Sequence, residues 1–114
     1  MPRSVWRLVA WGITIVVVGL CFLPGDDIGG PQVMDYDKLL HGLAFAAIGF
    51  AWVRSGFDLV GTLVLGLVLA LGTELGQQYL VEGREGDVLD LAADVGGLLL
   101  GTLIAALLPR ARTA

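Results

Sequence analysis

The chain has 114 residues, of which 56% are hydrophobic and only 16% are charged, and its net charge at pH 7 is −4. A soluble domain of this length is about half apolar and about a quarter charged, so this composition indicates a membrane protein with a single domain, residues 1–114. The net charge and the scattered seven cationic residues argue against a nucleic-acid partner, because no basic patch is present.

Four apolar runs are candidates for membrane spans, at approximately residues 5–23, 37–53, 59–81 and 88–108. A spanning helix needs about 20 mostly apolar residues, and the second run reaches that length when it is extended back to Tyr36. The first run follows two arginines and could be taken for a signal peptide. Its exit, "CFLPGDD", has no small-x-small cleavage site, so we expect it to be retained as a transmembrane helix.

The positions of the arginines predict the topology. Cytoplasmic segments of membrane proteins are enriched in Lys and Arg, and the relevant positions here are Arg3, Arg7, Arg54, Arg110 and Arg112. Placing them all inside requires an even number of spans. We therefore expect an all-α membrane protein, with four transmembrane helices in a compact bundle and both termini cytoplasmic. Its main expected partner is the lipid bilayer. The sequence does not indicate the oligomeric state.

With this topology, the polar residues within or beside the spans collect at the outer ends of the second, third and fourth helices. They are Asp37, Lys38, His41, Glu74, Gln77, Arg84, Asp87, Asp90 and Asp94. Ionisable side chains near hydrocarbon cost several kcal/mol unless they face the bundle, pair with one another or contact water. The sequence therefore predicts an outward-facing polar pocket that is acidic on balance.

The fourth helix shows how this pocket continues into the bundle. Asp87, Asp90, Asp94, Gly97 and Gly101 recur every three or four residues, so they share one helix face. Gly97 and Gly101 form a Gly-x-x-x-Gly pair, which allows two helices to approach closely in lipid.

Structural roles remain open for several of these polar residues. Asp87 can cap the helix, whereas Asp90 and Asp94 lie too deep for capping. Glu74 can pair with Arg84 or Lys38. A His on an apolar helix, such as His41, can be a buried hydrogen-bonding group, a proton carrier or a metal ligand. The tryptophans at 6, 11 and 52 suit interfacial anchoring or lipid contact.

Two segments resemble the VanZ-like family of small multi-span bacterial membrane proteins. "DKLLHGLAFAAIGF" resembles the family's Asp-Lys-x-x-His motif, and "ELGQQYLVEGREGDVLDLAADVGGLLLG" resembles its second signature. Together they cover roughly residues 34–105. The family usually has Asn where this chain has Asp94. The resemblance implies a bacterial inner-membrane setting and a link to glycopeptide resistance, since the family is named after a protein linked with reduced susceptibility to teicoplanin.

Three classes of function remain open. The first is binding of an envelope component, such as a lipid head group, a lipid-linked cell-wall intermediate or a lipophilic glycopeptide, in the polar pocket. The second is a metal-dependent enzyme acting on a lipid-linked or phosphorylated substrate. Its candidate ligands for Mg²⁺, Mn²⁺ or Ca²⁺ are Glu74, Asp90, Asp94 and His41. The third, an ion or solute carrier, ranks last because nothing polar continues to the inner face.

Overall fold

The computed structural model describes residues 2–22, 31–80 and 88–109, and within them only the backbone of residues 31–38, 80 and 88. The described part of the chain forms four helices, so the expected all-helical fold is confirmed. The helices are α1 (Arg3–Cys21), α2 (Pro31–Arg54), α3 (Leu59–Leu80) and α4 (Val88–Leu107). In lipid, backbone groups have no water to bond with, and a helix satisfies them within the segment itself.

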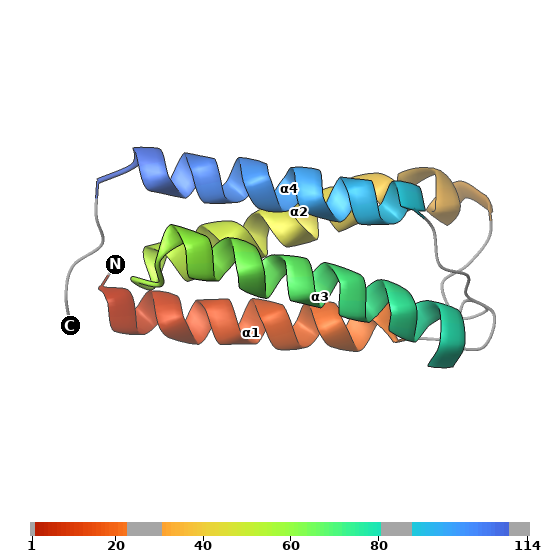
Figure 1. Cartoon of the computed structure of the whole chain (residues 1–114), viewed down its shortest axis with the longest axis horizontal. Coiled ribbons are helices and arrows are strands. Elements are labelled where there is room, and N and C mark those ends of the chain that lie inside the picture. Colours follow the sequence, from red (N-terminus) through yellow and green to blue (C-terminus); the bar gives the residue numbers. More distant parts are fainter. Residues whose placement is uncertain (1, 23–30, 81–87, 110–114) are drawn as a thin grey trace.

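The helices lie side by side along the long axis of a rod that measures 44 × 23 × 21 Å (Figure 1). This length matches a bilayer with its head-group regions, about 40–45 Å. Among the described residues, three helices are long and apolar enough to cross a membrane: Arg3–Cys21, Leu59–Tyr79 and Leu89–Leu107. The described side chains of α2 give a shorter apolar stretch, Leu39–Arg54. The α2 backbone begins at Pro31, a residue well suited to the first turn of a helix.

The bundle has two ends, the arginine end and the far end. At the arginine end, α1 and α3 begin and α2 and α4 end, and both Arg3 and Arg54 lie there. At the far end, α1 and α3 end and α2 and α4 begin (Figure 1). Consequently α2 and α4 run parallel to each other, and α1 and α3 run in the opposite direction.

The most extensive contact in the bundle is the seam between α2 and α4. A Cβ added at Gly97 would overlap the backbone carbonyl of Gly42, and one added at Gly101 would overlap that of Ala46. The sequence places small residues on both helices at these points. The two backbones therefore approach as closely as parallel small-x-x-x-small pairs allow.

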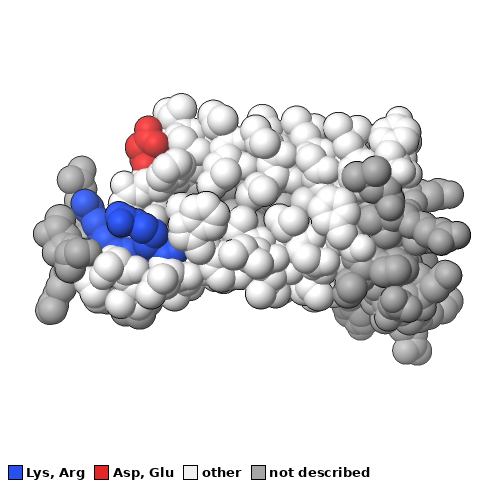
Figure 2. Space-filling model, turned by 90° about the horizontal axis from the view of Figure 1, so that it is seen from below, with Lys and Arg blue, Asp and Glu red and all other residues white. Residues whose placement is uncertain are grey.

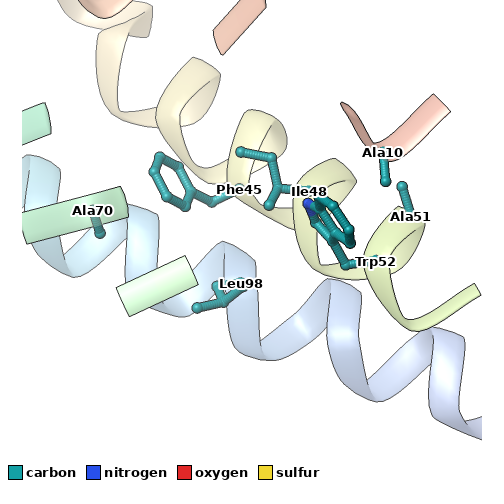
Figure 3. Packing of buried hydrophobic residues seen from close by; sticks show 7 residues of the cluster. All are labelled: Ala10, Phe45, Ile48, Ala51, Trp52, Ala70 and Leu98. Atoms are coloured by element: carbon teal, nitrogen blue, oxygen red, sulfur yellow. The ribbon is translucent and has the colours of Figure 1, made fainter. Parts of the chain in front are cut away.

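The hydrophobic core follows α2, which contributes Phe45, Ile48, Ala51 and Trp52 (Figure 3). The other helices add smaller contributions: Ala10 from α1 lies beside Ala51, and Ala70 and Leu98 come from α3 and α4 (Figure 3). The second helix thus contacts all three other helices, although its described apolar stretch is the shortest and Leu39, Leu40 and Leu43 are exposed.

One expectation about the tryptophans is wrong. Trp52 does not contact lipid or the membrane interface, because its side chain is buried and its indole N–H donates to the Thr14 hydroxyl at 3.0 Å. The Thr14 hydroxyl in turn donates to the Ala10 carbonyl at 2.7 Å. Trp11, which is exposed, agrees with lipid contact. The single threonine on α1 provides the polar partner that makes burial of Trp52 favourable.

The turn between α2 and α3 is defined by its backbone hydrogen bonds. Phe57 N–H donates to the Trp52 carbonyl and Gly56 N–H to the Val53 carbonyl, at 3.2 and 3.0 Å, which is a Schellman motif. Gly56 has φ +96°, a conformation that favours glycine. Asp58 then caps α3, accepting from the Gly61 N–H at 3.1 Å. This turn fixes α2 and α3 as an antiparallel pair.

Candidate functional site: the buried polar cluster

The centre of the candidate site is a buried side-chain pair between α2 and α4. Nδ1 of His41 lies 2.6 Å from Oδ1 of Asp94, and with Asp94 ionised the imidazole N–H donates to it. The two side chains are 9% and 0% exposed. A contact between residues so far apart in sequence depends on the parallel seam, since Gly42 and Gly97 lie next to the pair and bring the backbones together.

The pair lies well inside the bundle. At 1.5 Å per residue, His41 is about 20 Å along α2 from Arg54, and Asp94 is equally far along α4 from Leu107. With the arginine end at one membrane surface, the pair is deeper than the head groups of that surface but nearer to the far end. It therefore occupies the half of the bundle in which the sequence predicts the polar residues.

Two further carboxylates are buried at the same end. Asp90 lies one turn from Asp94 on the same face of α4, and Glu74 is buried on α3. A Cβ at Gly66 of α3 would overlap the Leu98 side chain of α4. Because these helices are antiparallel, the register that brings Gly66 to Leu98 places Glu74 at the height of Asp90.

Gln77 has a role that the sequence does not reveal. Its side-chain amide donates to the backbone carbonyl of Cys21 at 3.1 Å, and its side chain is 2% exposed. Cys21 is the last residue of α1, where carbonyls lack a partner within the helix. Gln77 therefore ties α3 to the end of α1. The residue before Gln77 also packs tightly against the end of α1, because a Cβ at Gly76 would overlap the Phe22 ring.

The remaining predicted site residues lie beyond what the structure describes. Arg84 and Asp87 are outside the described residues, and only the backbone of Asp37 and Lys38, in the first part of α2, is described. Among the described residues the structure brings together His41 and Asp94, with Asp90 on the same face of α4 and Glu74 at a matching height on α3. Within this part of the chain, no group of three or more His, Cys, Asp or Glu side chains is arranged to hold a metal ion.

The arrangement has two chemical capabilities. A carboxylate that accepts from one imidazole nitrogen sets the ring's orientation and tautomer, which prepares the other nitrogen to bind or exchange a proton. Buried carboxylates and an imidazole also favour binding of a molecule with a polar or cationic group. Charged side chains inside a membrane are stabilised mainly by polar or oppositely charged partners, which such a molecule would supply.

Comparisons with known proteins found no matching family model, no curated relative and no similar solved structure. The functional interpretation of this cluster accordingly depends on its own geometry. What the structure supports directly is a helical bundle with three helices long and apolar enough to cross a membrane, which indicates a membrane protein.

Proposed function

We propose that the chain is a four-span protein of the bacterial cytoplasmic membrane with its arginine end in the cytoplasm. The described Lys and Arg side chains are Arg3, Arg7 and Arg54, and the basic patch in Figure 2 lies at one end of a long uncharged surface. The positive-inside rule assigns such an end to the cytoplasm. Although the described apolar stretch of α2 is short, its backbone helix of 24 residues is long enough to cross.

Cysteine labelling tests this topology. In a Cys21→Ala background, a cysteine introduced at Gly29 is expected to react with a membrane-impermeant maleimide added to intact cells. A cysteine at Thr113 is expected to react only after the cells are opened. The reverse pattern, or labelling of both positions from outside, contradicts the proposed four-span topology.

The polar cluster of His41, Glu74, Asp90 and Asp94 binds the polar group of an envelope amphiphile in this proposal. The observation that carries it is the His41–Asp94 pair, buried between two helices whose close packing comes from glycines. Burying ionisable groups lowers stability unless excellent geometry compensates, and apolar residues could fill the same space. Such groups inside a membrane protein mark binding or transport sites more often than structural ones.

The position of the cluster supports this class of ligand. A molecule entering between helices from the outer leaflet would reach it with a polar head while its chain stays in lipid. Lipid-linked cell-wall intermediates and lipophilic glycopeptides have this form. The VanZ-like resemblance of the same residues adds the link to glycopeptide susceptibility, and that assignment remains a prediction.

Alanine variants at His41, Glu74, Arg84, Asp90 and Asp94, scored for membrane level and for susceptibility to lipophilic glycopeptides, test the binding proposal. We expect at least His41→Ala and Asp94→Ala to accumulate in the membrane and to lose the effect of the wild-type chain on susceptibility. Gln78→Ala, at an exposed position beside the site, is the matched control and is expected to behave as wild type. Variants that all accumulate and all retain wild-type susceptibility contradict the proposal.

A second candidate function is an enzyme acting on a lipid-linked or phosphorylated substrate. The 2.6 Å His41–Asp94 contact supports it, because an imidazole oriented by a carboxylate is suited to general acid–base catalysis. In the metal-dependent version, a divalent cation held by carboxylates would polarise a phosphoryl oxygen. Purified protein should then gain thermal stability with Mg²⁺, Mn²⁺ or Ca²⁺, and the gain should disappear in Asp90→Asn. Equal melting temperatures with and without these ions contradict the metal-dependent version.

A further inference from the structure

A cavity of about 420 Å³ lies at the arginine end of the bundle, whereas the polar cluster lies toward the far end. It is formed where the turn between α2 and α3 meets the start of α1 and the end of α4. Its lining includes Arg3, Arg54, Gly56, Phe57, Asp58 and Ala106. Gly56 brings the turn close to α1, since a Cβ there would come within 2.9 Å of the Arg3 Cδ.

Arg54 is held in place at the edge of this cavity. One terminal guanidinium nitrogen donates to the Pro109 carbonyl, and the guanidinium carbon lies 6.0 Å from the centre of the Trp6 ring. Its Nε is buried and has no hydrogen-bond partner among the described residues. The guanidinium is thus positioned by two neighbours, and because Nε is shielded from solvent, its terminal nitrogens are the donors that a ligand in the cavity would meet. Arginine donors in fixed positions are well suited to phosphate oxygens.

The cavity has a positive balance even though Asp58 also lines it. The Asp58 carboxylate accepts from the Gly61 N–H, so its charge is directed at the positive N-terminus of α3. Two arginines then face the cavity with one carboxylate that is already engaged. Figure 2 shows the described basic side chains gathered at this end, beside an acidic one.

The other walls of the cavity are apolar. Val53, Leu59 and Leu108 line it together with Phe57, and the large side chains at 57, 59 and 108 are also exposed on the outer surface of the helices. An apolar wall that continues onto the lipid-facing surface would accommodate an acyl chain, and the arginines would meet a head group. The rod is as long as a bilayer with its head groups, so this end lies at head-group level.

We propose that this cavity binds the phosphate group of an anionic phospholipid from the leaflet that surrounds the arginine end. This proposal requires membrane insertion but does not depend on the polar cluster or on the identity of its ligand. Substitutions of His41 or Asp94 should leave it intact, and substitutions of Arg3 should leave binding at the far end intact, so the two proposals can fail separately.

The test uses the full chain purified in a neutral detergent. Melting temperature and native mass spectra are recorded during titration with short-chain phosphatidylglycerol, short-chain phosphatidylcholine and inorganic phosphate. Phosphatidylglycerol is expected to bind at least about fivefold more tightly than phosphatidylcholine, and Arg3→Gln or Arg54→Gln to weaken it by about fivefold each. Arg7→Gln removes the same charge from an exposed position that does not line the cavity, and we expect less than about a twofold change.

A cavity-filling variant separates the site from the charge. Ala106→Phe keeps every arginine but occupies the cavity, and it should also lose the preference for phosphatidylglycerol. If Arg54→Gln does not fold, Arg3→Gln and Ala106→Phe carry the test. Equal weakening by Arg7→Gln and Arg3→Gln would show diffuse charge attraction and overturn the proposal. Unchanged binding by Ala106→Phe, or stabilisation by inorganic phosphate equal to that by the lipid, would overturn it as well.

Discussion

The two halves of the α2–α4 seam have similar backbone spacing but bury different side chains. Near the far end the seam holds the His41–Asp94 pair. Toward the arginine end the buried side chains of the two helices are apolar or hydroxyl, including Ile48, Ala105 and Thr102, and a Cβ at Gly49 would lie 2.9 Å from the Leu98 carbonyl oxygen. Because the described residues of this half bring α2 and α4 together without a buried carboxylate or imidazole, such groups are not needed for close packing of the two helices.

The buried polar residues of the two halves also differ in chemistry. Those toward the arginine end are mostly hydroxyls, and two of them donate to carbonyls of their own segment, whereas the Thr62 and Thr102 hydroxyls have no partner among the described residues. The Thr14 hydroxyl donates to Ala10, and that of Ser55 donates to Trp52 at 2.6 Å.

An ionised carboxylate cannot be satisfied by carbonyls, because it only accepts hydrogen bonds and needs donors. Asp90, in the first turn of α4, is near free backbone N–H groups, whereas Asp94 lies deeper in the helix. At the far end Asp94 therefore depends on a tertiary partner, His41, and this difference motivates the proposal of a binding site.

The largest expected effect comes from breaking the backbone contact shared by both halves. Gly97→Ala and Gly101→Ala should each force α2 and α4 apart, because the new Cβ meets a backbone carbonyl that cannot move away. We expect a loss of about 3 kcal/mol in the free energy of unfolding, measured by denaturant titration in detergent micelles.

Gly96→Ala is the control for helix propensity. A Cβ at Gly96 meets nothing within 4 Å, so this change is expected to be neutral or to stabilise α4 by up to about 1 kcal/mol. If Gly96→Ala and Gly97→Ala destabilise the protein equally, the close seam does not determine its stability.

The packing of the arginine-end half does not depend on a buried ionisable pair, so the next largest effect tests whether the half near the far end needs the His41–Asp94 pair for stability. Asp94→Val alone leaves His41 buried without the carboxylate it bonds, and it should cost about 3 kcal/mol of unfolding free energy. The double variant His41→Leu/Asp94→Val makes this half resemble the other one, and its stability is expected to be within about 1 kcal/mol of wild type. A double variant as unstable as the single one would show that the pair holds the fold together.

A smaller effect is expected at the link between α3 and α1. Gln77→Leu removes the donor to the Cys21 carbonyl and should lower the unfolding free energy by about 2 kcal/mol. Gln78→Leu, at the adjacent exposed position, should change it by less than about 0.5 kcal/mol. Equal losses in the two variants would mean that the hydrogen bond contributes nothing.

The smallest effect tests the hydroxyls of the arginine-end half. Thr14→Val keeps the shape of the side chain but leaves the Trp52 indole without its acceptor, and we expect a loss of about 1 kcal/mol. Thr14→Ser retains the hydroxyl and is expected to preserve both the stability and the tryptophan fluorescence maximum. A red shift in both variants would indicate that Trp52 is exposed in either case.

Much of the fold follows from the sequence because long apolar runs in a membrane permit few structures other than helices. The four helices and the small-residue face at Gly97 and Gly101 can be recognised from spacing alone. The partner surface on α2 cannot be recognised in this way, because Gly42 and Ala46 can be assigned to the contact only once the parallel alignment of α2 and α4 is known. The roles of Gln77 and Trp52 were missed for the same reason, since their partners on α1 are a backbone carbonyl and a single threonine.

The candidate site was predicted in composition but not in geometry. Periodicity places Asp90 and Asp94 on one face, and topology places His41 at the same membrane depth. That Nδ1 of His41 meets Oδ1 of Asp94 depends on helix rotation, which the sequence does not specify. The cavity at the arginine end is less predictable still, because it is formed by a turn and two helix ends that only tertiary packing brings together.

The most direct test of the central claim, that the far-end cluster binds a ligand, is native mass spectrometry of protein extracted gently from its own membrane. Wild type and His41→Leu/Asp94→Val are compared at equal folded fraction. We expect an amphiphile bound to wild type at one copy per chain and absent from the double variant. The same bound mass at the same occupancy in both proteins would contradict it.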